Sequence, residues 1–163
     1  MKTTIILLFV PLLSFSQITY KDVMSINSLN QFKRIMIEKN YEYDESLENN
    51  NMILYGYNIT RDSIKGNKAT SWSYYNIKNN NWTIELSVKS VFGVFLNSTD
   101  NYKNPYYLIT ENIKKKCRFY KIIKDKKDDI DFATYSCSES TYKGKIGFAI
   151  YDGQGIIKHF TTY

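Results

Sequence analysis

Acid–base and nucleophilic chemistry has few candidate residues in this chain. His159 is the only histidine among the 163 residues. A Cys–His nucleophile pair would require Cys117 or Cys137 to stay reduced and to lie beside that imidazole. The serine elbow G-x-S-x-G, the zinc motif H-E-x-x-H and the phosphate loop G-x-x-x-x-G-K are all absent from the sequence. We therefore interpret His159 as an ordinary strand histidine, predict no catalytic residue, and favour a protein that is not an enzyme.

Carboxylates form one local cluster. Asp128, Asp129 and Asp131 could join Asp152 around a calcium ion, because hard cations prefer clustered oxygen ligands. The spacing of an EF-hand loop is absent, so we interpret the cluster as a charged turn. One histidine and two cysteines leave a structural zinc site one ligand short. We predict neither a metal nor another cofactor.

Aromatic residues are the most suggestive feature, since the chain holds 15 Tyr, 9 Phe and 2 Trp. Trp72, Tyr74 and Trp82 fall on two strands that we expect to be neighbours, and Glu85 follows on the second. Facing solvent, these residues would form an amphipathic platform for a protein or a saccharide. Packed beneath helices, the aromatic rings would belong to the core instead, and this alternative stays open. The predicted binding set is Trp72, Tyr74, Trp82 and Glu85.

The two cysteines invite a disulfide. Cys117 and Cys137 are an even pair, and an exported protein meets an oxidising compartment. Two buried, reduced thiols are the alternative. We predict that the two residues are bonded.

Export is predicted from the first 16 residues. Lys2 supplies a basic start, an apolar run extends from Ile5 to Leu13, and Ser14 and Ser16 are small residues before a cleavage point after Ser16. The apolar run is much shorter than the roughly 20 residues that span a bilayer. We expect a secreted or periplasmic protein whose mature chain has no integral membrane segment.

Basic residues concentrate in one stretch of a chain whose formal net charge is +6. Lys114, Lys115, Lys116 and Arg118 open this stretch. Asp125 interrupts its continuation to Lys127, and Asp128, Asp129 and Asp131 follow it. We interpret it as a solvated helix face that leads into a polar turn, and predict no nucleic-acid partner.

Two amphipathic helices and several alternating strands organise the rest. Ser28 caps a predicted helix over residues 28–40, and Asn104 and Pro105 open a second that continues to Tyr120. The stretch from Glu42 to Asn51 lacks periodicity and is predicted to be a loop. Alternation predicts strands over residues 53–59, 72–77, 82–88, 132–138, 145–151 and 156–160, with a further short strand over 91–96.

This order predicts an α+β fold in one domain, residues 17–163. Two passes of an αβββ-like unit would build an antiparallel sheet with both helices packed on one face. The predicted core contains Leu29, Phe32, Ile35, Ile109 and Ile113, packed on Ile84, Leu86 and Phe148. We expect a binding or interaction module that uses the other face. The alternative is a small hydrolase outside the cytoplasm with dispersed carboxylates, of which Glu85 is the first to examine.

Overall fold

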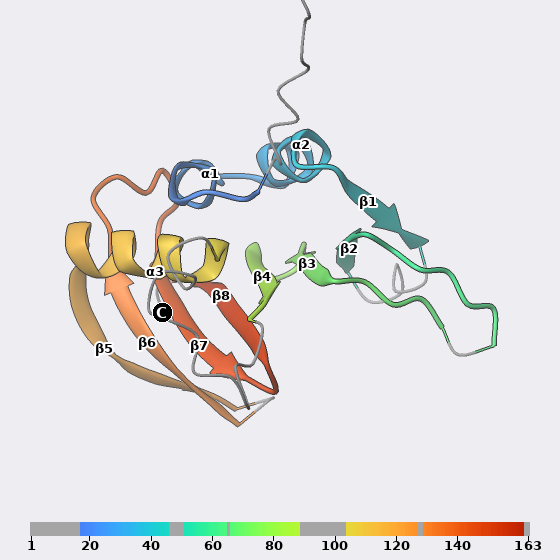
Figure 1. Cartoon of the computed structure of the whole chain (residues 1–163). Helices are drawn as coiled ribbons and strands as arrows, with labels where there is room; N and C mark the ends of the chain where they lie inside the picture. Colours follow the sequence, from blue (N-terminus) through green and yellow to red (C-terminus); the bar gives the residue numbers. More distant parts are fainter. Residues whose placement is uncertain (1–16, 46–50, 65, 89–103, 127–128, 162–163) are drawn as a thin grey trace, which may run out of the picture.

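The described part of the chain forms one antiparallel sheet with three helices, an α+β architecture (Figure 1). A computed structural model describes residues 17–45, 51–64, 66–88, 104–126 and 129–161. The helices are α1 (Tyr20–Ser25), α2 (Leu29–Glu38) and α3 (Pro105–Lys116). The strands are β1 (Tyr41–Asp44), β2 (Met52–Tyr57), β3 (Ser71–Asn76), β4 (Asn81–Ser87), β5 (Arg118–Asp125), β6 (Ile130–Ser136), β7 (Lys145–Tyr151) and β8 (Gln154–Phe160).

The strand order within the sheet is β1-β2-β3-β4-β8-β7-β6-β5. Consecutive strands pair as hairpins on either side of a central junction, where β4 pairs with β8. Because side chains alternate across a strand, the register defines two faces. The Lys158 face is the side that carries Leu54, Tyr74, Thr83 and Lys158. The Trp82 face is the opposite side, which carries Trp82.

The main core lies on the Trp82 face. Phe32, Ile35, Ile109 and Ile113 from α2 and α3 join Ile84 of β4 in one cluster of fully or nearly fully buried side chains. These residues and Leu86 were predicted to be in the core, and the prediction is confirmed. Leu29 and Phe148 also pack against the cluster, but they are only partly buried. Spacing at helical and strand periods therefore selected the buried positions of α2, α3 and β4.

Helix α3 lies close to β8 because the strand has a glycine at the contact. A Cβ atom on Gly155 would lie 2.3 Å from the ring of Tyr106, so only glycine admits this ring. The Tyr106 hydroxyl donates a hydrogen bond of 2.9 Å to the backbone oxygen of Ala149 in β7. One residue of α3 is thereby fixed to two adjacent strands.

The prediction that this helix continues to Tyr120 is wrong. The helix ends at Lys116, Cys117 is extended, and Arg118–Asp125 forms the edge strand β5. Cys117 and Tyr120 continue the helical spacing of Ile113, which made the sequence misleading here. Pairing with β6 overrides that local pattern, and Ile122 and Ile123 suit a strand.

The predicted cysteine pair is brought together at this helix–strand junction. The Cα atoms of Cys117 and Cys137 lie 4.5 Å apart, and the sulfur atoms are at disulfide-bonding distance. The pair connects the end of α3 with the segment that follows β6.

Two short elements were missed. Thr19 and Asp22 form a capping box that starts α1, in which each residue's side chain hydrogen-bonds the other's backbone N–H. Strand β1 replaces part of the predicted loop: Tyr41 and Tyr43 pair with Tyr57 and Tyr55 of β2. The strand predicted over residues 91–96 lies outside the described residues.

The Lys158 face carries a second, smaller apolar cluster. It consists of Ile130, Phe132, Ala149 and Ile156, with Phe160 packed against them. Asp125 at the end of β5 forms a salt bridge with Lys158 of β8, although β6 and β7 separate these strands in the sheet. The sheet therefore curls at this end so that β5 bends back over the Lys158 face (Figure 1).

Candidate functional site

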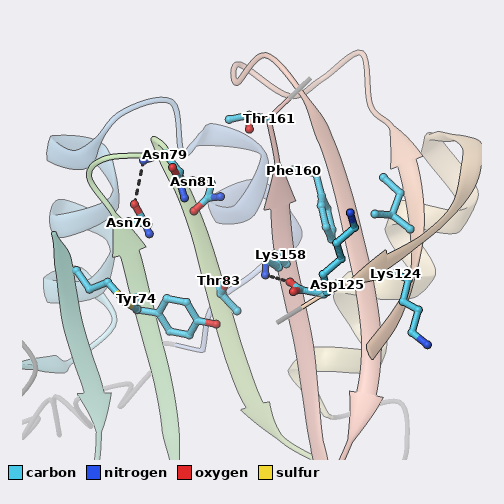
Figure 2. Close-up of a pocket in the computed structure, with 13 residues that line it drawn as sticks. Tyr74, Asn76, Asn79, Asn81, Thr83, Lys124, Asp125, Lys158, Phe160 and Thr161 are labelled. Atoms are coloured by element: carbon cyan, nitrogen blue, oxygen red, sulfur yellow. Dashed lines mark hydrogen bonds and ion pairs between the residues drawn. The ribbon is translucent and has the colours of Figure 1, made fainter. Parts of the chain in front are cut away.

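A row of three opposed residues crosses the centre of the Lys158 face. Tyr74 of β3 pairs with Thr83 of β4, and Thr83 pairs with Lys158 of β8. Directly opposed residues of antiparallel strands project from the same face of a sheet. The register therefore gathers a phenol, a hydroxyl and an ammonium group side by side (Figure 2).

Lys158 is held by a carboxylate and two aromatic rings. Its Nζ atom hydrogen-bonds Asp125 and lies 5.8 Å from the ring centroid of Phe132 and 5.7 Å from that of Phe160. Both charged side chains are largely buried. An ion pair in such surroundings gains attraction from the low dielectric and has little freedom to leave it. The pair is a fixed feature of this face.

The curl of the sheet creates a groove of about 670 Å³ on the Lys158 face. One wall is the β3–β4 hairpin, which contributes mainly hydroxyl and amide groups. The other wall is formed by the ends of β5 and β8, as Figure 2 shows. The hairpin wall comprises Tyr74, Asn76, Asn79, Asn81 and Thr83, and the second comprises Ile123, Lys124, Asp125, Lys126, Lys158, Phe160 and Thr161.

Hydrogen bonds within the turn and from the core fix the β3–β4 hairpin that carries the asparagines. Asn76 accepts a hydrogen bond of 2.9 Å from the backbone N–H of Asn79. Asn80 has a left-handed φ of 51°, a conformation that asparagine tolerates better than most residues. The hydroxyls of Tyr75 and Tyr142, both in the core, bond to Asn80. The turn therefore presents its amides in a defined arrangement.

Of the predicted binding residues, only Tyr74 lies at the groove. Tyr74 lines the groove. Trp72 lies on the same face, where its ring covers Gly56 on the neighbouring strand. Glu85 also lies on this face and is partly buried, but it does not line the groove.

Trp82 requires a correction. Its side chain is 1% exposed and belongs to the main core. Tyr75, not Tyr74, is its partner across the hairpin, so Trp82 and Tyr74 project from opposite faces. Trp82 therefore contributes to folding and is removed from the candidate site.

His159 also lies in the core and is 1% exposed. Its ring is 5.8 Å from that of Trp82 and 4.1 Å from that of Tyr142, measured between centroids. Burial lowers the pKa of His159 to about 4, and an interaction with the Lys143 backbone opposes this shift only in part. Neither ring nitrogen has a hydrogen-bond partner of normal geometry within the described residues. The imidazole is neutral at pH 7 and faces away from the groove.

The groove residues that sequence reasoning missed are Asn76, Asn79, Asn81, Asp125 and Lys158. The run Asn79–Asn81 was recognised only as a turn, and its local pattern gives no sign that Asn79 and Asn81 line a groove. No sequence signal joins Asp125 to Lys158, because 33 residues separate them.

The described part of the chain offers little for metal or acid catalysis. It contains no cluster of three or more His, Cys, Asp or Glu residues able to hold a metal ion. Among the described residues that line the groove, Asp125 is the only carboxylate, and Lys158 neutralises it. None of the helices within these residues is both long and apolar enough to cross a membrane.

Comparison with known proteins gives no functional assignment. No family model, no curated protein and no solved structure matches this chain. The groove and its chemistry are therefore the basis for a functional proposal.

Proposed function

We propose that this protein is an exported binding module, not an enzyme, and that its groove takes a short saccharide. The observation that carries the proposal is the groove on the Lys158 face, whose hairpin wall presents three asparagine amides beside a tyrosine. Each amide offers two N–H donors and a carbonyl acceptor, which suits neighbouring sugar hydroxyls that both donate and accept. Tyr74 and Phe160 add apolar surface for the faces of sugar rings.

The hollow shape favours a small ligand over a protein partner. A volume of about 670 Å³ lies within the range of small-molecule sites. A protein partner would more commonly meet a broad surface with a buried aromatic centre. Of the two tryptophans predicted to provide such a centre, Trp82 lies in the core, and Trp72 packs over Gly56.

Binding is favoured over hydrolysis by the carboxylates of the groove. Glycoside hydrolysis normally needs two carboxyl groups that flank the scissile bond. Among the described residues of the groove, Asp125 is the only one, and it is held in an ion pair with Lys158. The described groove therefore lacks the second carboxyl group that this reaction needs.

The proposal includes a finer description of the fold. All three helices would cover the Trp82 face and leave the Lys158 face open. Two tandem units, α2 with β1–β4 and α3 with β5–β8, would meet at the β4–β8 junction. The order of elements and the single main core support this arrangement.

Export to the periplasm or the exterior is also part of the proposal. The signal falls on residues 1–16, outside the described residues, and the cysteine pair at bonding distance suits an oxidising compartment. Mass spectrometry of the native protein should find Gln17 at the N-terminus. Recovery of intact Met1 on the folded protein would contradict cleavage.

The saccharide proposal is tested by binding. The purified protein is screened on an array of neutral and acidic oligosaccharides, and calorimetry then gives the dissociation constant of each hit. Replacement of Asn81 by Ala should weaken binding by about tenfold or more, as expected for a loss of paired hydrogen bonds. The control is Asn30→Ala, which changes an exposed asparagine on α2.

Two outcomes would refute the saccharide proposal. One is an array without a hit, and the other is a hit whose affinity falls equally in both variants. Release of shortened oligosaccharides by the wild-type protein would instead favour the hydrolase.

A further inference from the structure

Strand β5 is a long edge of the sheet. It contains 8 residues, pairs with β6 on one side, and ends the strand order. No strand among the described residues pairs with its outer side. In an edge strand, alternate backbone N–H and C=O groups point outward, where they can accept another strand.

The side chains of this edge are unusually apolar for an exposed strand. Phe119, Tyr120 and Ile122 are 53%, 51% and 63% exposed. They line the same edge as the basic residues Arg118 and Lys121, which are also exposed. The strand thus combines apolar surface, positive charge and open backbone groups.

The basic stretch that the sequence placed on a helix is divided by the structure. Lys114, Lys115 and Lys116 form the last turn of α3, while the residues from Arg118 onward belong to β5. Among the described residues, neither Arg118 nor Lys121 makes a salt bridge. Lys121 instead lies 5.3 Å from the ring centroid of Tyr120. Within the described ranges, the positive charge at the start of this edge has no acidic partner in a salt bridge.

A second copy of the chain is a poor occupant of this edge. An antiparallel pair of β5 strands centred near Lys121 would bring the Lys121 side chains of the two copies together, and like charges across strands are destabilising. Lysine on an edge strand discourages pairing with a strand of the same charge.

We propose that the outer edge of β5 binds an extended acidic peptide as an added strand. Main-chain hydrogen bonds would provide affinity, and side chains on alternating positions would provide selectivity. Acidic residues of the peptide pair with Arg118 and Lys121, and its apolar residues pack on Phe119 and Ile122. The end of β5 also forms a wall of the groove, but the residues that carry this proposal, Arg118 to Ile122, do not line it.

The test uses the full mature protein and a capped peptide of alternating Glu and Val residues, as long as β5. Hydrogen exchange is measured with and without this peptide. We expect slower exchange at amides of β5, with little change at β1, the opposite edge. Raising the salt concentration should weaken binding, because the charges involved are exposed.

Charge reversal tests the role of the basic residues. The double variant Arg118→Glu and Lys121→Glu should bind the peptide about tenfold more weakly or worse. Its matched control reverses the exposed residues Lys21 and Lys78, which gives the same net charge away from β5. The milder Lys121→Gln variant repeats the test if the double variant has a lower unfolding midpoint.

Four results would overturn the proposal. An alternating Lys and Val peptide could bind equally well, or a version of the acidic peptide interrupted by proline could do so. The protected amides could lie outside β5. A single-stranded oligonucleotide of equal charge could displace the peptide and protect the same amides, which would identify a nucleic-acid surface instead.

Discussion

Mild acid should destabilise this protein through His159. The imidazole is buried beside Trp82 and Tyr142, and its pKa is lowered from 6.5 to about 4. In the unfolded chain the same residue takes up a proton near pH 6.5. Because the folded-state pKa is the lower one, the stabilisation is fully present above pH 6.5 and is lost as the pH falls towards 4.

The size of the effect follows from the shift. Each pKa unit corresponds to about 1.4 kcal/mol between the two protonation states. The free energy of unfolding should therefore fall by about 2 kcal/mol between neutral pH and about pH 5, and by about 3 kcal/mol at about pH 4. The chain has no other histidine, so no other side chain of ordinary pKa titrates between about pH 5 and 7.

Urea unfolding at a series of pH values measures this loss. The control is the His159→Gln variant. Its free energy of unfolding at neutral pH can differ from that of the wild type, but this free energy should hardly change between pH 7 and pH 5. Proton NMR of the folded protein gives the pKa directly from the imidazole resonances. A pKa of His159 near 6.5 in the folded protein would refute the reasoning. So would a free energy of unfolding that changes equally with pH in the wild type and the variant.

Three further perturbations test the fold and the groove, each by urea unfolding. Phe32→Ala should lower the free energy of unfolding by about 3–5 kcal/mol, because the ring is fully buried. A decrease below about 1 kcal/mol would contradict the core position of Phe32. Reduction of the disulfide, whose cysteines are 20 residues apart, should cost about 3 kcal/mol, and thiol labelling of unreduced, denatured protein should find no reactive thiol. Lys158→Met should cost about 2 kcal/mol because it leaves Asp125 buried without its cation, whereas Lys124→Met, at an exposed ion pair, should cost less than about 1 kcal/mol. Equal losses for the two lysines would show that the groove pair is not special.

Local sequence patterns correctly predicted the helices and strands in which local conformation and burial favour the same residue types. Ser28 caps α2 as expected, and the spacing of Phe32 and Ile35 selected its buried face. Alternation likewise located β4 and the buried positions Ile84 and Leu86. At these positions the local conformation and the burial require the same residue types, so the sequence suffices.

Strand β5 shows where local reasoning stops. The residues up to Tyr120 continue a helical spacing, but partners 5 to 18 positions away in β6 convert Arg118–Asp125 into a strand. Pairing with a distant segment is a tertiary interaction, and it outweighs the small energy differences of local propensity.

The sequence by itself determined many of the helix and strand signals, the core positions of α2, α3 and β4, the cysteine pair and the scarcity of catalytic groups. Tertiary structure alone decided the composition of the candidate site. Alternation shows that neighbouring residues face opposite ways, but it does not show which side the helices cover. The register of one hairpin separated Trp82 from Tyr74, and the curl of the sheet joined Asp125 to Lys158 across two intervening strands. Both outcomes depend on how distant strands pair and bend, which no single stretch of the chain encodes.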